Sequence, residues 1–359
     1  MRRTRMQLWL PKTMKTSAKL ILHSRNPDGV ELLTWQLTYW RAIHAEVMTH
    51  RAFSRNASSS RAIPVEKQLR AIVEDCAGPI HWGANQKGMQ AAGQLEGEEL
   101  ETAKLQWRFA ALDALTFAED LSGIGLHKQI ANRVLEPFSH ITVLLSSTLP
   151  ALRHFWALRA HPDAQPEFQL LAYRMLDVYL KSRPQEVAVG RWHVPFGDQI
   201  SSESGVCYCG AEMEGHSLYD NHAPKDNPAP FSWSDTLKIA TARCARVSYL
   251  THDGRLDPVA DLGLYDRLAA SDPSHASAFE HCAQAQWIGP GKISNFDVGF
   301  RVDNEDGNGS GWLQYRKTLP REFRGDFDPR KAMARKPAWV NLDQDSDRPE
   351  CLSDLSNRS

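Results

Sequence analysis

Apolar and polar residues alternate from residue 30 to residue 39, which is the period of a half-buried β-strand. The turn-forming residues 26–29, Asn-Pro-Asp-Gly, come directly before this stretch. Residues 97–121 instead carry apolar side chains at near-helical spacing, with acidic residues in the first turn and glycines beyond the end. The pattern therefore predicts a strand early in the chain and a long amphipathic helix after it.

Further apolar stretches predict more helices, and changes in composition predict segments outside the packed domain. Helices are expected over four more stretches: 128–135, 168–180, 238–247 and 257–270. A further apolar stretch covers residues 141–158, so the first half of the chain is expected to be mainly helical. Residues 191–235 are rich in Gly, Pro, Ser, Asn and Asp, which indicates a linker or insertion. We expect residues 1–25 to be a frayed arm and residues 321–359 a polar tail.

Composition and charge narrow the classes of function. The chain has 359 residues, of which 42% are hydrophobic and 24% charged. No apolar run approaches the roughly 20 residues that a membrane span needs, so we expect a soluble protein with no membrane partner. The net charge is -1, with 42 basic and 43 acidic residues. This balance gives no general attraction for a nucleic-acid backbone, so no nucleic-acid partner is expected.

The six cysteines are scattered through the chain, as in proteins of a reducing cytosol. Cys207 and Cys209 lie near histidines, as in a zinc site, but the second half of a CxxC pair is missing, and we expect no metal. The Gly-rich residues 307–311 lack the Lys-Ser/Thr of a phosphate loop, and no GxGxxG follows a strand. The expectation is a cytoplasmic protein without a Rossmann-type site.

Two short segments concentrate side chains that can bind a ligand. Residues 44–61 are rich in His, Arg, Ser and Asn, and arginines beside hydroxyls can form an anion cradle; a solvated, serine-rich loop is the alternative. Residues 275–281 hold two histidines and a glutamate, which can bind a metal or a polar ligand. Ser277 and Glu280 also fit a helix capping box. The residue types alone leave these alternatives open.

The first segment resembles the signature of a known enzyme family. That signature usually reads Arg-His-Arg, two residues, Ser, and then a Ser-x-Arg ending. Residues 49–61, which read Thr-His-Arg-Ala-Phe-Ser-Arg-Asn-Ala-Ser-Ser-Ser-Arg, match its register without a gap. Arg133 with Pro137, and the Leu-Arg, Ala-Gln and Glu of residues 158–167, resemble later motifs in the same order. The family is the flavin-dependent thymidylate synthases, or ThyX.

Two more family motifs occur on the far side of the expected linker. Residues 245–248, Ala-Arg-Val-Ser, and residues 275–281 resemble segments that the family places upstream of its main signature. The chain therefore resembles a circularly permuted, phage-type member, in which residues 236–320 complete the domain of residues 26–190. Such a permutation is tolerated where the old and new chain ends lie in exposed loops.

The resemblance implies an α+β fold, with a twisted, mainly antiparallel sheet flanked by long helices. In the family, the segment that ends at His281 leads directly into the strand before the main signature. His281 is therefore expected close to residues 28–32, far away in this sequence. The resemblance also implies a homotetramer with sites between subunits, in the cytoplasm, or the host cytoplasm if a phage encodes the chain.

The implied activity is the reductive methylation of dUMP to dTMP. Methylenetetrahydrofolate supplies the carbon, reduced FAD supplies the hydride, and NADPH reduces FAD again; the protein supplies orientation and electrostatics. Family members need no cysteine nucleophile, so none of the six cysteines is expected to be catalytic.

The resemblance also assigns roles to single residues. Three are expected to be catalytic: Ser59, Arg61 and Arg159. The flavin is expected to contact His50, Arg51, Ser54, His154, Gln165, Ser248, His275 and Ser277. The nucleotide is expected to contact Glu46, Ser59, Ser60, Arg61, Arg133 and Arg159.

Several positions depart from the family's pattern. Thr49 replaces an Arg, Ala57 a Glu, Asp163 a His and His154 an Asn, and Glu46 stands where a Gln is usual. A carboxylate accepts a hydrogen bond from an exocyclic amine but donates none to a carbonyl unless it is protonated. Methylation or hydroxymethylation of a related nucleotide such as dCMP is therefore one alternative. A non-catalytic homologue that binds nucleotide or folate is the other.

Overall fold

The computed structural model describes the following residues: 16–88, 91, 93–197, 200, 233–247, 257–270, 276–286, 311–319, 329–335 and 337. The chain divides into two compact units, Met1–Pro320 and Arg321–Ser359. The second unit contains the helix α11 (Pro329–Ala334). All the elements described below belong to the first unit.

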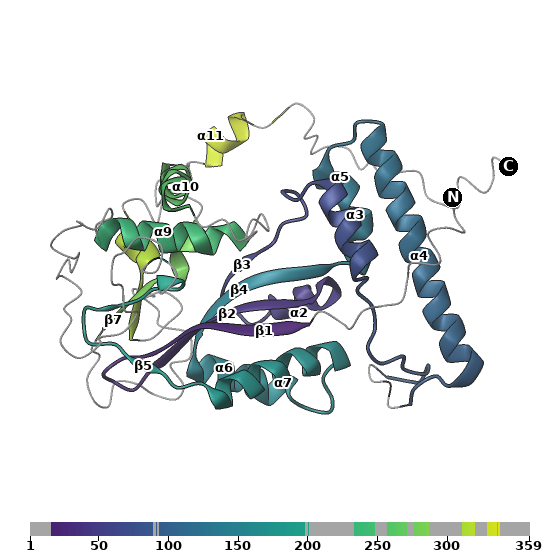
Figure 1. Ribbon diagram of the computed structural model, residues 1–359, viewed down its shortest axis with the longest axis horizontal. Coiled ribbons are helices and arrows are strands. Elements are labelled where there is room, and N and C mark those ends of the chain that lie inside the picture. Colours follow the sequence, from purple (N-terminus) through teal and green to yellow (C-terminus); the bar gives the residue numbers. More distant parts are fainter. Residues whose placement is uncertain are drawn as a thin grey trace. The chain divides into compact units, whose positions relative to one another are not determined.

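The first unit is built on a five-stranded sheet with the order β3-β4-β2-β1-β5 (Figure 1). Its strands are β1 (Ser17–Arg25), β2 (Glu31–Trp40), β3 (Ser54–Ala57), β4 (His140–Thr148) and β5 (Gln185–Glu186). Every neighbouring pair is antiparallel except β1 with β5, which is parallel. The strand predicted over residues 30–39 is β2, which lies in the middle of the sheet because it pairs with β1 on one edge and with β4 on the other. Its alternate apolar residues Leu33, Trp35, Leu37 and Tyr39 are buried on one face.

Helices α6 (Leu149–Arg159) and α7 (Pro166–Lys181) cover that face (Figure 1). Trp35 and Leu37 of β2 point toward them and pack with Phe155 in one buried cluster. Burying side chains of this size stabilises the fold by about 1.5–3 kcal/mol each. A proline in the first turn of each helix fixes φ where no hydrogen bond from its N–H is needed.

The opposite face of the sheet is covered by residues from the far part of the chain. The covering elements are α9 (Trp233–Arg246), α10 (Pro258–Ala270) and the 3-10 helix η4 (Ala276–Glu280). Leu144 of β4 packs there with Cys244 and Phe279. A mainly antiparallel sheet with helices on both faces confirms the predicted α+β class.

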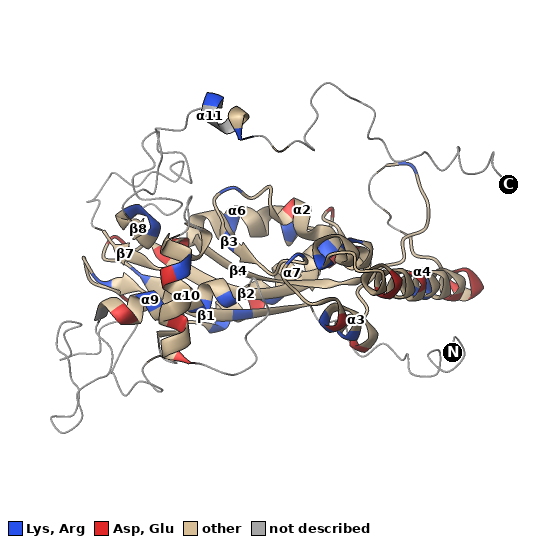
Figure 2. Cartoon of the chain, turned by 90° about the horizontal axis from the view of Figure 1, so that it is seen from above, with Lys and Arg blue, Asp and Glu red and all other residues tan. Residues whose placement is uncertain are grey.

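A second helical layer contains the longest helix. Its elements are α3 (Val65–Glu74), α4 (Gly97–Gly123), α5 (Lys128–Ala131) and the 3-10 helix η2 (Asn132–Phe138). Ala111, Leu115 and Ala118 of α4 are buried in a cluster with Ile72 and Phe138. Figure 2 shows acidic and basic residues side by side along α3 and α4. The helix predicted over residues 97–121 is confirmed as α4.

A three-stranded sheet joins the two sides of the expected linker. It consists of β6 (Trp192–His193), β7 (Ala283–Ala285) and β8 (Trp312–Gln314), in that order, and the 3-10 helix η5 (Tyr315–Thr318) follows it. The remaining short elements are η1 (Arg41–Ile43) and α2 (His44–Val47). Residues 192–193 therefore form a strand inside the segment that the composition assigned to a linker.

Other sequence expectations are confirmed or need correction. The helices predicted over residues 168–180, 238–247 and 257–270 are α7, α9 and α10. The expected frayed arm is wrong for residues 17–25, which form β1, because pairing with β2 along their length satisfies their backbone groups.

The apolar stretch 141–158 is strand β4 followed by helix α6, which an unbroken apolar run cannot distinguish from one element. The helix predicted over residues 128–135 is one α-helical turn followed by η2, where Pro137 removes a helical donor.

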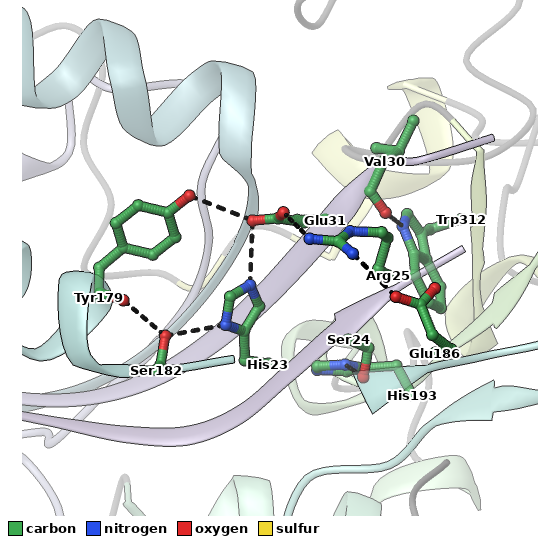
Figure 3. A network of polar contacts seen from close by, with 10 residues as sticks. All are labelled: His23, Ser24, Arg25, Val30, Glu31, Tyr179, Ser182, Glu186, His193 and Trp312. Atoms are coloured by element: carbon green, nitrogen blue, oxygen red, sulfur yellow. Dashed lines mark hydrogen bonds and ion pairs between the residues drawn. The ribbon is translucent and has the colours of Figure 1, made fainter. Parts of the chain in front are cut away.

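Glu31 connects β1, β2 and α7 at one end of the five-stranded sheet (Figure 3). Its carboxylate accepts hydrogen bonds from His23 Nε2 (3.0 Å), Arg25 Nη2 (2.9 Å) and Tyr179 Oη (3.3 Å). Burial acts to raise the pKa of Glu31, but the hydrogen bonds from Arg25 and His23 outweigh it and lower that pKa. Arg25 also pairs with Glu186 of β5 at 2.8 Å, so β5 is held at this end as well.

Five buried side chains form a continuous hydroxyl–histidine network between the two sheets. His193 Nδ1 lies 2.8 Å from Ser24 Oγ, and His193 Nε2 lies 2.8 Å from Thr34 Oγ1. Thr34 Oγ1 lies 2.6 Å from Ser146 Oγ, which in turn lies 2.8 Å from His281 Nδ1. In a water-poor interior such bonds are strong, and leaving one partner unsatisfied is costly. The network therefore fixes β6 and His281 on β1, β2 and β4.

The two histidines of this network make stability depend on pH. Burial lowers the pKa of both His193 and His281 from 6.5 to about 3. Between these values the unfolded chain binds protons that the folded chain does not, so stability is full above about pH 6.5 and falls as the pH decreases. We expect the free energy of unfolding to fall by up to about 1.4 kcal/mol per pH unit for each histidine.

Urea unfolding at several pH values below neutrality measures this dependence. His193→Asn should flatten the slope, whereas His161→Asn, at an exposed position, should leave it unchanged. An equal slope in wild type and His193→Asn would contradict the assignment.

Candidate active site

The turn between α2 and β3 carries His50 and Arg51. Thr49 Oγ1 donates a hydrogen bond to the Glu46 carbonyl at 2.6 Å, and the His50 N–H donates to the Val47 carbonyl at 3.3 Å. Both bonds close the end of α2, and one of them comes from Thr49, which stands where the signature usually has an arginine. The turn is therefore ordered by local contacts and presents the two residues just before β3.

The imidazole of His50 lies among aromatic rings and against an arginine. Its centroid is 5.4, 5.1 and 6.2 Å from those of Phe53, Phe155 and Phe168. Arg159 Nε donates to His50 Nε2 at 3.3 Å. Because arginine only donates, Nε2 is an acceptor and the ring is neutral, with its proton on Nδ1. Burial, and then the nearby positive charges, lower the pKa of His50 to about 4, so the neutral form persists at physiological pH.

Arg159 brings several predicted site residues together. Its guanidinium lies 4.4 Å above the Phe168 ring, and its Nη1 lies 3.7 Å from Glu46 Oε2. The side chains of Glu46 and Arg159 are 44% and 23% exposed, so the ion pair is weak and both groups remain accessible to a ligand. His154 is exposed on the same helix and contributes to the low pKa of His50. Glu46, His50, His154 and Arg159 therefore form one group, here called the His50 group.

Two further predicted flavin contacts lie at the surface. Arg51 follows His50 and is exposed. Gln165 precedes α7, is exposed, and donates from Nε2 to Glu167 Oε2 at 2.9 Å. Glu167 is buried, and its other oxygen accepts a hydrogen bond from the Ile80 N–H at 2.9 Å. Glu167 thus orients Gln165, a role that its motif alone did not indicate.

The predicted phosphate contacts gather around η2. Ser60 Oγ and Arg133 Nη1 both donate to Glu136 Oε1, at 2.7 and 2.8 Å. Ser59 Oγ accepts a hydrogen bond from the Arg61 N–H at 3.3 Å. Arg61 is exposed and makes no ion pair within the described part of the chain, so its charge is available to an anion.

Glu136 belongs to this neighbourhood although the sequence analysis missed it. It pairs with Arg133 at 2.8 Å and lies 3.5 Å from Arg41 Nη1. The spacing of three residues between Arg133 and Glu136 is the signal for such a helical pair. The pairing partly neutralises Arg133 and leaves Arg61 as the stronger candidate for a phosphate contact.

Ser54 and Ser277 lie on the other face of β3, toward η4. Gln314 Nε2 donates to Ser54 Oγ at 2.8 Å, and Ser277 Oγ donates to Asn56 Oδ1 at 3.3 Å. Asn56 Nδ2 in turn donates to the Cys244 carbonyl at 2.7 Å. These bonds tie α9, η4 and β8 to β3. Ser248 and His275 lie outside the described residues.

A small cavity lies beside Ser54. Its volume is about 10 Å³, which is room for about one water molecule. It is lined by Leu32, Ser54, Ser146, Ser147, Glu280, Ala283, Trp312 and Gln314. The cavity is too small for a flavin ring, and Ser54, at 1% exposure, is enclosed. Within one chain, His50 and Ser54 therefore face different sides of β3.

The segment after His281 packs against the start of β2. Val30 and Leu32 form a buried cluster with Ala283 and Ala285, and Trp312 Nε1 donates to the Val30 carbonyl at 3.1 Å. Residues 283–285 therefore lie beside residues 30–32, and His281 itself contacts Ser146, which is opposite Thr34 of β2. The permutation itself remains a proposal.

The zinc alternative falls largely outside the described chain. Cys207 and Cys209 are not described, and Cys244 is buried. Among the described residues, no three His, Cys, Asp or Glu side chains are grouped so that they could hold a metal ion. No helix in the same described ranges is long and apolar enough to cross a membrane.

Comparison with known proteins gives one family match. The model of the family described as "Thymidylate synthase complementing protein" matches residues 31–185, which are 155 of the 359 residues. The match covers less than half of the chain, and it includes the signature segment and the later motifs that resemble the ThyX family. None of the curated proteins compared with the chain matches it.

Two solved structures are also similar to the chain. Both are of the UMP/dUMP methylase PolB from Streptomyces cacaoi, one bound with 5-Br dUMP and one with 5-Br UMP. Sequence identities are 19% and 17%, and TM-scores are 0.34 and 0.40. The matches cover 42% and 48% of this chain, and 66% and 92% of the PolB chains.

The difference between Arg61 and the paired Arg133 gives a testable prediction. Arg61→Ala should weaken binding of a nucleoside monophosphate roughly 10-fold or more, because a forked guanidinium makes charge-assisted bonds to phosphate. Lys87→Ala, at an exposed position outside the residues around η2, should leave binding of the nucleoside monophosphate unchanged. Isothermal titration of both variants measures the effect, and equal losses would rule out the cradle.

Proposed function

We propose that the chain is an FAD-dependent thymidylate synthase that converts dUMP to dTMP with methylenetetrahydrofolate and NADPH. The observation that carries the proposal is the convergence of motif residues in the family-matched segment. Glu46 and His50, from α2 and the turn after it, meet Arg159, from the end of α6, at one accessible surface. Bound FAD supplies the redox chemistry, which no protein side chain provides.

In this proposal the group around η2 holds the phosphate of the nucleotide. Arg61 and Ser59 bind the phosphate, with Arg133 in support and Ser60 held by Glu136. Arg159 contacts the nucleotide from the His50 group. Fixed cations of this kind orient a phosphate without reorganisation when the reaction proceeds.

The chain's own residues fit a flavin in part. A neutral imidazole at His50 with an accessible arginine at 51 suits a planar, anionic cofactor. Ser54 and Ser277, however, lie on the opposite face of the edge strand β3. Because one ring system cannot contact both faces through the strand, the flavin must lie at the free edge of β3 or take residues from a second copy.

A flavin that contacts residues from two copies of the chain agrees with the proposed homotetramer. Helix α4 exposes Leu105, Phe109 and Phe117, at 42%, 39% and 60%. Leu105 and Phe109 are four residues apart, and Phe117 follows eight residues later, so they share one face of the helix. A stripe of large apolar residues on one face is typical of a protein–protein contact. A second copy of the chain is the proposed occupant.

Phe109→Lys with Phe117→Lys is expected to reduce the oligomer. Charges introduced on a buried interface face cannot be paired there, so the tetramer should dissociate into smaller species. Sedimentation velocity measures this, with Glu119→Lys as the control on the same helix. Wild type that sediments as a monomer would contradict the homotetramer.

Glu46 favours a second candidate substrate. Its carboxylate lies at the accessible surface beside Arg159, where it can accept a hydrogen bond from an exocyclic amine. A cytosine nucleotide such as dCMP, methylated or hydroxymethylated at the same carbon, is therefore the alternative to dUMP. Glu46→Gln restores the family's usual residue and should shift the preference from dCMP toward dUMP if Glu46 reads the base.

Cofactor content and product analysis test the proposal. We expect the purified protein to be yellow, to release FAD on denaturation, and to form dTMP from dUMP with methylenetetrahydrofolate and NADPH. If the protein forms a product from dCMP but not from dUMP, then dCMP is the substrate instead of dUMP. Protein that binds nucleotide but carries no flavin and turns over neither substrate would show a non-catalytic homologue.

A further inference from the structure

Arg55 is a side chain of the main signature to which the motif resemblance assigns no role. It lies in β3 opposite Leu145 of β4, between Ser54 and Asn56, which face η4. Because successive side chains of a strand alternate, Arg55 faces the other side, toward α2 and the His50 group. It is half-buried, and burial lowers its pKa.

One nitrogen of Arg55 links the two carbonyl groups that bracket the turn. Nη1 donates to the Val47 carbonyl at 3.0 Å and to the His50 carbonyl at 2.9 Å. The Val47 carbonyl also accepts from the His50 N–H at 3.3 Å, and the His50 carbonyl accepts from the Phe53 N–H at 3.1 Å. Arg55 therefore adds a side-chain clamp to a turn that main-chain bonds already close.

We propose that Arg55 is a positioning residue that holds the turn of His50 so that Nε2 of His50 faces Arg159 and accepts its hydrogen bond. The inference rests on the proposed function, because that function gives His50 a ligand to contact. α2 is a single turn and is too short to be rigid without further contacts. Thr49 stands where the family's pattern has an arginine, and Arg55 supplies a cation that is bonded to the backbone of this turn.

The consequence is a defined tautomer of His50. When Nε2 accepts from Arg159, the proton of the neutral ring must lie on Nδ1. The titratable and charged groups that face the ring are Arg159 and His154 from α6 and Arg55 from β3, with Glu46 of α2 paired to Arg159. Loss of the clamp frees the ring to rotate, and Nε2 can then carry the proton.

The test compares Arg55→Met, which keeps the apolar stem without a donor, with Arg55→Lys, which keeps a charge that can donate to both carbonyls. Both carbonyls retain their backbone donors in Arg55→Met, so the fold should persist, and thermal unfolding checks this. Arg70→Met, at an exposed position on α3, is the matched control.

The first measurement is ¹⁵N NMR of the histidine side chains in the full chain above neutral pH, with His50 assigned through His50→Gln. Wild type, Arg55→Lys and Arg70→Met should show the Nδ1–H tautomer, and Arg55→Met should show a mixture with Nε2–H. This readout does not depend on turnover, so it separates failure of the inference from failure of the proposed function.

Kinetics give the second measurement. Arg55→Met should lower kcat/KM roughly 10- to 100-fold, as expected for misplacement of about 1 Å, and Arg55→Lys should recover most of it. An unchanged tautomer in Arg55→Met overturns the inference, even if the pKa of His50 rises, because removal of a charge alone explains that rise. Equal kinetic losses in Arg55→Met and Arg70→Met overturn it as well.

Discussion

The hydroxyl–histidine network joins strands β1, β2 and β4 to His193 of β6 and to His281. Thr34 and Ser146 lie opposite each other on the central strands β2 and β4, and each hydroxyl contacts a buried histidine from another part of the chain. His193 and His281 are fully buried, and hydroxyl groups are the partners of both ring nitrogens of His193 and of Nδ1 of His281. This contact therefore fixes β6 and His281, which lies between η4 and β7, on β1, β2 and β4.

Because η4 lies on one face of β3 and the turn of His50 on the other, the candidate site residues fall into two sets. β3 is the edge strand, and its alternating side chains serve two environments. Asn56 connects to the Cys244 carbonyl and to Ser277 on one face, whereas Arg55 connects to the turn of His50 on the other. A cofactor that uses both sets of residues must therefore bind at the strand edge or between copies, which is why the proposed flavin site and the proposed oligomer depend on each other.

The sequence predicted the periodic elements and the grouping of motif residues better than the contacts between them. The alternation of residues 30–39 and the helical spacing of residues 97–121 identified β2 and α4, because each pattern is long and regular. β1 was missed because its pairing with β2, not its own pattern, stabilises it. The motif resemblance pointed to the His50 group. Spacing signals the pair of Arg133 and Glu136, but it does not reveal the bond from Ser60 to Glu136, 76 residues away, or the bonds from Arg55 to backbone carbonyls.

Hydrogen–deuterium exchange with FAD and dUMP tests most directly the central claim, that the family motifs of this chain form one nucleotide and flavin site. We predict protection in peptides that cover residues 46–61 and 154–165 and in those that cover residues 276–281, because ligand contacts and the oligomer would restrain all three. Peptides of β1, which β4 and β2 separate from β3 in the sheet, should exchange at unchanged rates. Protection absent from residues 46–61 while the ligands bind elsewhere would contradict the account.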